Sequence, residues 1–251
     1  MIRLATGVTP NYLPRARAFL RSLEPLSSRS NAIGAVFIVA DDPPSGVVLP
    51  IVDIVTVKYA DAALQLPKWM LQNGGFCDFV PEWWAEDDVI IFCDADAVLQ
   101  RAFTEDEKAL FNSLTDFQVL AGRNKPCGTQ RLDDEATALS MHCSHAELED
   151  WFPDYDKAVC LNFGFVAARL SAWRLLLKMS VKLWPNIERA FANAAMVQWM
   201  MCYAIHALKM TLLELPLSVH AHGHLGLPEG VTCTDGIWYH NGTVVAYAHA
   251  L

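Results

Sequence analysis

Short apolar runs alternate with helical patterns through the first hundred residues of the chain. Four of these runs predict strands, at residues 2–8, 35–40, 51–57 and 89–93. A helix is predicted over residues 13–23, where Pro14 fits the first turn. Strands that are separated by helices indicate a mostly parallel sheet, and such a sheet holds ligands beyond the carboxyl ends of its strands. The expected fold class is therefore α/β.

The second half of the chain has a less regular pattern. Residues 104–158 are polar and rich in acidic side chains, which predicts short helical pieces inserted over the sheet. The later elements are predicted as a strand at 162–166, helices at 171–183 and 186–209, strands at 213–215 and 219–222, and a hairpin around Asn241-Gly242. Since no repeat, low-complexity tract or clear linker interrupts the sequence, we expect one domain over residues 1–251.

Composition narrows the class of protein. The 251 residues are 53% hydrophobic and 19% charged, which excludes a largely disordered chain. The net charge of −9 disfavours a nucleic-acid partner, because backbone binding needs clustered Lys and Arg. Seven scattered cysteines without a Cys-x-x-Cys pair favour a reducing compartment, so we expect a cytoplasmic protein. The first residues lack the apolar core of a signal peptide, and the most apolar stretch, 194–210, is too short and too polar for a transmembrane segment.

The strongest chemical signal is a pair of acids, Asp94 and Asp96, directly after the apolar run at 89–93. The end of a buried strand is where a parallel sheet presents ligands. Mn²⁺ and Mg²⁺ prefer oxygen ligands and often leave their remaining positions to phosphates. An acidic surface turn is the alternative, but the continuous apolar run before the pair favours a metal site.

Three further segments join this pair in a resemblance to known enzymes. IIFCDADAVLQR resembles the Asp-x-Asp segment of nucleotide-sugar-dependent glycosyltransferases with the GT-A fold, and LATGVTPNYLPRARAFLRSL resembles their first strand and helix. Residues 162–166, Asn-Phe-Gly-Phe-Val, are similar to the Asn-x-Gly segment of the donor-sugar pocket in glycosyltransferase family 8. His240-Asn241-Gly242 is similar to the late His with nearby Gly that closes the metal site of that family. The segments occur in the expected order and span nearly the whole chain.

The resemblance implies a Rossmann-like, mostly parallel central sheet flanked by helices, with a smaller mixed C-terminal sheet region. Residues 1–100 would be the nucleotide-sugar-binding half and 101–251 the acceptor-side half. The implied activity is metal-dependent transfer of a sugar, with retention, from a nucleotide-sugar donor such as a UDP-sugar to an unidentified acceptor, a saccharide or glycan first among them. The implied metal is Mn²⁺ or Mg²⁺. The implied metal ligands are Asp94, Asp96 and His240; the nucleoside contacts are Thr6, Val8 and Tyr12; the residues near the sugar are Asn162 and Gly164; and the residues of the catalytic centre are Asp94, Asp96 and Asn162.

The sequence departs from the family 8 pattern at two places. A Lys that meets the donor phosphate usually follows the late His, but residues 243–247 contain none. Lys68, which opens a predicted helix where the helix dipole does not favour a cation, is the substitute we expect, with Lys58 and Arg15 as alternatives. The Asp-Gln pair that usually precedes the long helix is also missing, and Asn193 and Gln198 are the nearest polar residues.

A second group of histidines offers another metal site. His220, His222 and His224 alternate, so all three would share one face if residues 219–225 form a strand. Such a trio could itself bind Zn²⁺ or Ni²⁺, for which imidazole is a common ligand. In the GT-A enzymes that this sequence resembles, the late His comes from either region, so the resemblance makes His222 an alternative third ligand to His240. His240 also has a simple structural explanation, since it precedes an Asn-Gly hairpin turn.

Two other functions stay open on the sequence. A metal-dependent hydrolase would use His220, His222 and His224 with Asp94. A non-catalytic nucleotide-sugar-binding module would explain the missing Lys after His240. A nicotinamide-dependent oxidoreductase, a P-loop kinase and a serine hydrolase are disfavoured, because Gly-x-Gly-x-x-Gly after the first strand, Gly-x-x-x-x-Gly-Lys-Ser/Thr and Gly-x-Ser-x-Gly are all absent.

Overall fold

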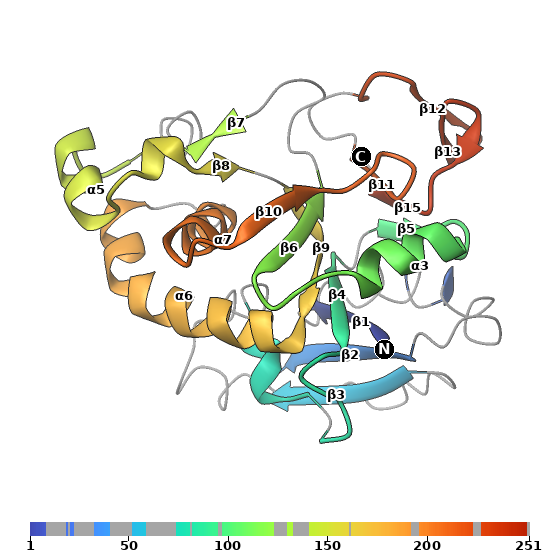
Figure 1. Ribbon diagram of the computed structural model, residues 1–251, viewed down its shortest axis with the longest axis horizontal. Helices are drawn as coiled ribbons and strands as arrows, with labels where there is room; N and C mark the ends of the chain where they lie inside the picture. The colour runs from blue at the N-terminus through green and yellow to red at the C-terminus, as the bar shows by residue number, and fades with distance from the viewer. Residues whose placement is uncertain are drawn as a thin grey trace.

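A seven-stranded sheet forms the centre of the computed structural model (Figure 1). The structure describes residues 1–8, 19, 21–22, 33–40, 52–58, 74–80, 82–94, 97–122, 130–132, 141–160, 162–191, 196–222 and 227–249. The strands of the central sheet are β1 (Ile2–Val8), β2 (Ile33–Ala40), β3 (Val52–Lys58), β4 (Val89–Cys93), β6 (Gln118–Gly122), β9 (Asn162–Arg169) and β10 (Thr211–Glu214). Their spatial order is β10-β6-β9-β4-β1-β2-β3.

One strand of this sheet runs against the others. β1 is parallel to β2 and β4, β2 is parallel to β3, and β10 is parallel to β6. β9 is antiparallel to both of its neighbours, β4 and β6. The central sheet is therefore mixed, with a parallel majority, as the GT-A resemblance implies. Because β9 is reversed, its first residues lie at the same edge as the carboxyl ends of β4 and β6.

Helices cover both faces of the sheet. The longer helices are α6 (Leu170–Ala190), α7 (Met196–Ala207), α3 (Glu105–Asn112) and α5 (His145–Trp151). Ile90 of β4 lies in one core cluster with Trp173 of α6 and Trp199 of α7. Ile91, the next residue, lies in a second cluster with Phe111 of α3. Since consecutive strand residues point to opposite faces, burial on both sides explains why β4 is apolar throughout.

Smaller sheets and short helices complete the described part of the chain. A mixed sheet of order β11-β15-β5 and an antiparallel sheet of order β12-β13-β14 match the expected C-terminal sheet region (Figure 1). The bounds of the short elements are β5 (Ala97–Leu99), β7 (Gln130–Arg131), β8 (Val159–Cys160), β11 (His220–His222), β12 (Val231–Thr234), β13 (Ile237–His240), β14 (Thr243–Val244), β15 (Tyr247–His249), and the 3-10 helices η3 (Gly75–Asp78) and η4 (Tyr155–Lys157).

Most of the predicted elements are confirmed. The first and fourth strands have the predicted bounds, and strands are also present at the second and third predicted positions. Within the predicted helix at 13–23, Phe19, Arg21 and Ser22 are helical, and its other residues lie outside the described part. The Asn241-Gly242 hairpin is also confirmed: both residues have positive φ, 49° and 79°, as a tight two-residue turn requires.

Two predictions about the second half were wrong. Residues 104–158 are not only an insertion over the sheet, because β6 lies inside the sheet between β9 and β10. The break between the two long helices also lies later than predicted, since α6 continues through Pro185 to Ala190. Pro185 leaves only the carbonyl of Val181 without its helical donor, and Val181 is exposed, so water can take that donor's place. Among the described helices, none combines the length and apolar character that a membrane span requires.

Candidate functional site

The site is built around Asp94, the residue that directly follows β4. Its backbone N–H donates to the carbonyl of Gly164 at 3.0 Å, which extends the pairing of β4 with β9 by one step. Its side chain is half-buried. Because β9 is antiparallel to β4, the first residues of β9 meet Asp94 at this edge of the sheet. Asp94 and Gly164, which the sequence assigned to the metal and to the sugar, are therefore in direct contact.

Asn162 lies at the start of β9 and shapes the same segment. Its Oδ1 accepts the N–H of Gly164 at 2.8 Å, and the residue is buried. It pairs with Gly122 at the end of β6, where the register shifts by a bulge. Among the described residues, none accepts a hydrogen bond from the Nδ2 of Asn162. This amide can therefore donate to a ligand at the edge of the sheet.

Gln198 reaches the Asn162–Gly164 segment from α7. Its Oε1 accepts the N–H of Phe163 at 3.4 Å, and its Nε2 lies 3.8 Å from the Sγ of Cys160. The sequence pointed to Gln198 only as a nearby polar residue in place of a missing Asp-Gln pair. The structure brings it beside two of the predicted sugar-binding residues.

Thr6 lies in β1, the parallel neighbour of β4. Its side chain is fully buried, and its Oγ1 has no hydrogen-bond partner in the described part of the protein. A buried hydroxyl without a partner is costly, so a polar group from a ligand or from another part of the chain is expected there. Val8 ends β1, and its backbone alone is described. Tyr12, Lys68, Asp96 and His224 lie outside the described residues.

His240 belongs to the small antiparallel sheet of order β12-β13-β14. It ends β13, its Nε2 is 3.2 Å from the Nδ2 of Asn241, and its ring lies beside Gly230. No contact with Asp94 is found among the described residues, and these residues contain no group of three His, Cys, Asp or Glu side chains that could hold a metal. Asp96, the second predicted ligand, is not among them.

The register of the β11-β15-β5 sheet points to a histidine that the sequence analysis missed. His249 is paired with Ala97, the residue directly after Asp96, and on its other side with His222. Only the backbone of His222 and His249 is described. His249 gave no local signal in the sequence, because its place beside Ala97 comes from the pairing of β15 with β5.

His220 belongs to an aromatic cluster. Its ring is 2% exposed, is stacked on Phe165 at a centroid distance of 5.7 Å, and lies 5.6 Å from the ring of Tyr247. A Cβ atom added to Gly122 would come within 2.3 Å of its Nδ1. Its imidazole therefore packs inside the protein. Since His224 lies outside the described residues, the three-histidine site stays a prediction.

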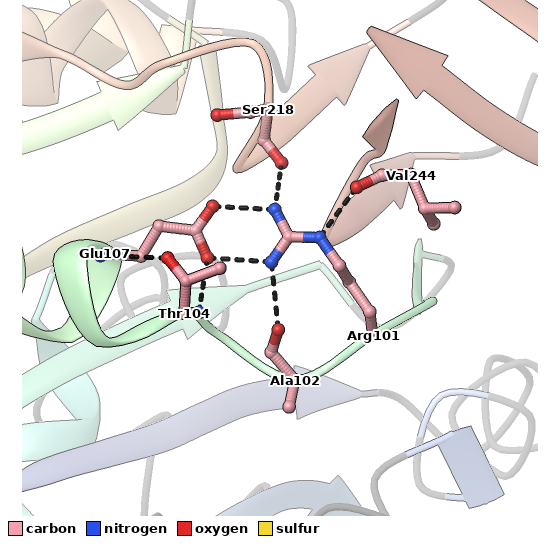
Figure 2. A network of polar contacts seen from close by, with 6 residues as sticks. All are labelled: Arg101, Ala102, Thr104, Glu107, Ser218 and Val244. Carbon is pink, nitrogen blue, oxygen red and sulfur yellow. Dashed lines mark hydrogen bonds and ion pairs between the residues drawn. The ribbon is translucent and has the colours of Figure 1, made fainter. Parts of the chain in front are cut away.

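An ion pair fixes the segment that follows β5. Arg101 binds both carboxylate oxygens of Glu107 in α3, at 2.7 and 2.8 Å (Figure 2). Its other contacts are to the carbonyls of Ala102, Ser218 and Val244, so all five N–H groups of the guanidinium are used. Burial by itself would raise the pKa of Glu107, but hydrogen bonds from Arg101 and from the helix N-cap hold this pKa below its ordinary value.

Solved structures of glycosyltransferases share this architecture. The galactosyltransferase LgtC, in complex with donor and acceptor sugar analogs, superposes with a TM-score of 0.58 at 12% identity, over 98% of this chain and 86% of LgtC. Mouse xyloside xylosyltransferase 1, in its apo form, gives a TM-score of 0.58 at 13% identity, over 100% of this chain and 98% of the mouse protein. The chain has the GT-A fold.

The GT-A fold extends to a bifunctional enzyme as well. WbbM matches with a TM-score of 0.53 at 10% identity, over 88% of this chain and 40% of WbbM. No protein-family model and no curated protein matches the sequence. At identities of 10–13%, the likeness establishes the fold, and the site residues must carry any argument about the reaction.

Proposed function

We propose that this chain is a metal-dependent glycosyltransferase that moves a sugar from a nucleotide-sugar donor, with UDP-sugars first among the donors, to a saccharide or glycan acceptor. The observation that carries the proposal is the 3.0 Å hydrogen bond between Asp94 and Gly164, which joins the predicted metal and sugar residues at one edge of a GT-A sheet. LgtC, a protein of the same fold, is described with donor and acceptor sugar analogs. The chain would act as one domain, and a cytoplasmic location stays a prediction.

The predicted ligands have the chemistry that a hard divalent cation prefers. Carboxylate oxygens and an imidazole nitrogen are ligands that Mn²⁺ accepts, and Asp94, Asp96 and one histidine would supply them. The register of β15 against β5 favours His249 over His240 and His222 as that histidine. When bound, the cation would offset the negative charge that develops on the departing diphosphate.

The other residues would bind and orient the donor. Asn162 would donate from Nδ2 to a sugar hydroxyl, and Gly164 would let the sugar approach the backbone. Gln198 is the next candidate, because it is bonded to the same segment and because one LgtC structure is that of an active-site mutant with glutamate in place of glutamine. The remaining donor contacts proposed are Thr6, Val8 and Tyr12 for the nucleoside and Lys68 for the diphosphate. Retention of configuration is proposed from the family resemblance alone.

Release of UDP or GDP from a panel of nucleotide sugars, with and without Mn²⁺, tests the proposal. We expect release by the wild-type protein only with Mn²⁺, and a loss of about 100-fold in the Asp96→Ala variant, because the cation contributes several kcal/mol to leaving-group stabilisation. Asp87→Ala is the matched control: this exposed acid precedes β4, at the opposite end of the same strand, and should leave release unchanged.

Other outcomes contradict the proposal and separate its alternatives. Donor binding without turnover, for any donor and acceptor in the panel, would indicate a binding module. Metal-dependent hydrolysis that needs no nucleotide would favour a hydrolase. Equal activity of the wild-type protein and Asp96→Ala would remove the acid pair from the mechanism.

A further inference from the structure

Tyr247 in β15 makes a direct contact with the first of the two acids. Its hydroxyl donates to the backbone carbonyl of Asp94 at 2.7 Å, across 153 residues of sequence. The residue is 1% exposed, and its ring lies against Phe165 and Phe19 at centroid distances of 5.0 and 6.2 Å. A ring packed on several sides has few orientations, so it holds its hydroxyl in a fixed place.

The carbonyl oxygen of Asp94, which Tyr247 binds, accepts two hydrogen bonds from described residues. The same oxygen accepts the N–H of Ala97 at 3.4 Å, while the N–H of Asp94 donates to Gly164. Ala95 and Asp96 lie between the two residues that meet at this oxygen. The hydroxyl of Tyr247 therefore acts on the backbone at the point where the acid pair begins.

Tyr247 is itself well anchored. Its N–H donates to the carbonyl of Val219 at 2.8 Å, and its register partners are Leu99 in β5 and His220 in β11. Two residues later, His249 is paired with Ala97. One short strand thus carries both the group that binds the carbonyl of Asp94 and the histidine that pairs with Ala97.

We propose that Tyr247 is a positioning residue: its hydroxyl fixes the backbone of Asp94 and thereby presets this acid, the first of the two predicted metal ligands, for a divalent cation. This inference rests on the proposed function, since that function supplies the cation. Groups that orient metal ligands through hydrogen bonds commonly affect metal affinity by tenfold or more. Tyr247 would act in this way through the main chain, without contacting metal or substrate.

The Tyr247→Phe variant tests the proposal because it removes only the hydroxyl and keeps the packed ring. We expect the affinity for Mn²⁺, titrated by electron paramagnetic resonance without nucleotide, to fall about tenfold. Tyr203→Phe is the matched control. The hydroxyl of Tyr203, in α7, also donates to a backbone carbonyl, that of Pro153 at 3.2 Å, and its loss should leave the Mn²⁺ affinity unchanged.

Amide hydrogen exchange of Ala97, measured without metal, gives a second readout that does not depend on the cation. In Tyr247→Phe this amide should exchange several times faster, because its acceptor carbonyl is less firmly held. An unchanged exchange rate, an unchanged Mn²⁺ affinity, or an equal loss of affinity in Tyr203→Phe would overturn the proposal. A wild-type protein that binds no Mn²⁺ would contradict the proposed function instead, and the exchange of Ala97 would then decide alone whether Tyr247 positions Asp94.

Discussion

The absence of a side chain at Gly122 leaves room for the buried ring of His220. A Cβ atom at this position would lie 2.3 Å from the Nδ1 of His220, whose ring packs against Phe165 and Tyr247. Because the imidazole is enclosed, it cannot swing into solvent to relieve the clash. We expect Gly122→Ala to lower the free energy of unfolding by about 2 kcal/mol, as overpacking of a filled core does. Urea unfolding measures this.

A double-mutant cycle shows whether the clash with His220 is the cause. His220→Ala removes the ring, so adding Gly122→Ala to it should cost much less than in the wild-type background. If the two losses simply add, the cost of Gly122→Ala arises elsewhere, for example in the bulge where Gly122 pairs with Asn162.

His249 and His240 are competing candidates for the third metal ligand, and alanine variants of the two distinguish them. His249 lies next to Ala97 in register, whereas the described contacts of His240 are with the turn at Asn241 and with Gly230. We expect His249→Ala to weaken Mn²⁺ binding by more than the tenfold that loss of a merely orienting group costs, and His240→Ala to change it less than about twofold. Mn²⁺ titration of both variants measures this. The reverse result would restore His240, the residue that the family resemblance implies.

At the scale of elements, the sequence predicted the strands and turns whose formation depends on the local pattern of residues. β4 was predicted with its observed bounds because its five residues are all apolar and buried between two layers of helices. The Asn241-Gly242 hairpin was predicted because its turn depends on two neighbouring residues alone. β6 was missed because its short apolar core, Val119 to Ala121, lies in a polar stretch and becomes a strand by pairing with β9.

The residues of the candidate site likewise divide into those that the local sequence predicts and those whose place depends on long-range pairing. Asp94 and Asn162 could be predicted, since each stands at a strand boundary in a segment that resembles known enzymes. Tyr247 and His249 could not, because the contact of Tyr247 with Asp94 and the pairing of His249 with Ala97 join segments some 150 residues apart in sequence. Gln198 is intermediate: its polarity drew notice, but its contact with Phe163 depends on how α7 packs on the sheet.

At the scale of the whole molecule, Arg101 and Glu107 join segments that are far apart in the chain. Their network connects the end of β5 with the cap of α3, with Ser218 ahead of β11, and with Val244 ahead of β15 (Figure 2). Arg101 thus binds residues that lie just before two strands, β11 and β15, of the β11-β15-β5 sheet. Loss of this pair should therefore loosen the C-terminal sheet region, and its effect should depend on pH.

The sign of the pH effect follows from the lowered pKa of Glu107. A carboxyl whose pKa is lower in the folded state adds stability above its unfolded pKa of about 4.3, and this contribution is lost as the pH falls through the folded value. We expect Arg101→Ala to cost about 3 kcal/mol at pH 7, because it leaves a buried carboxylate unpaired. The cost should be less at pH 3, because without Arg101 burial raises the pKa of Glu107, and the carboxyl takes up a proton as the pH falls and then needs no cation. Urea unfolding at both pH values measures the two losses.

Glu105→Gln breaks an exposed ion pair with Lys108 in the same helix and should cost less than about 0.5 kcal/mol at either pH. A cost of Arg101→Ala that is the same at pH 7 and pH 3 would mean that Arg101 holds these segments through its three carbonyl contacts, and that its charge on Glu107 contributes little.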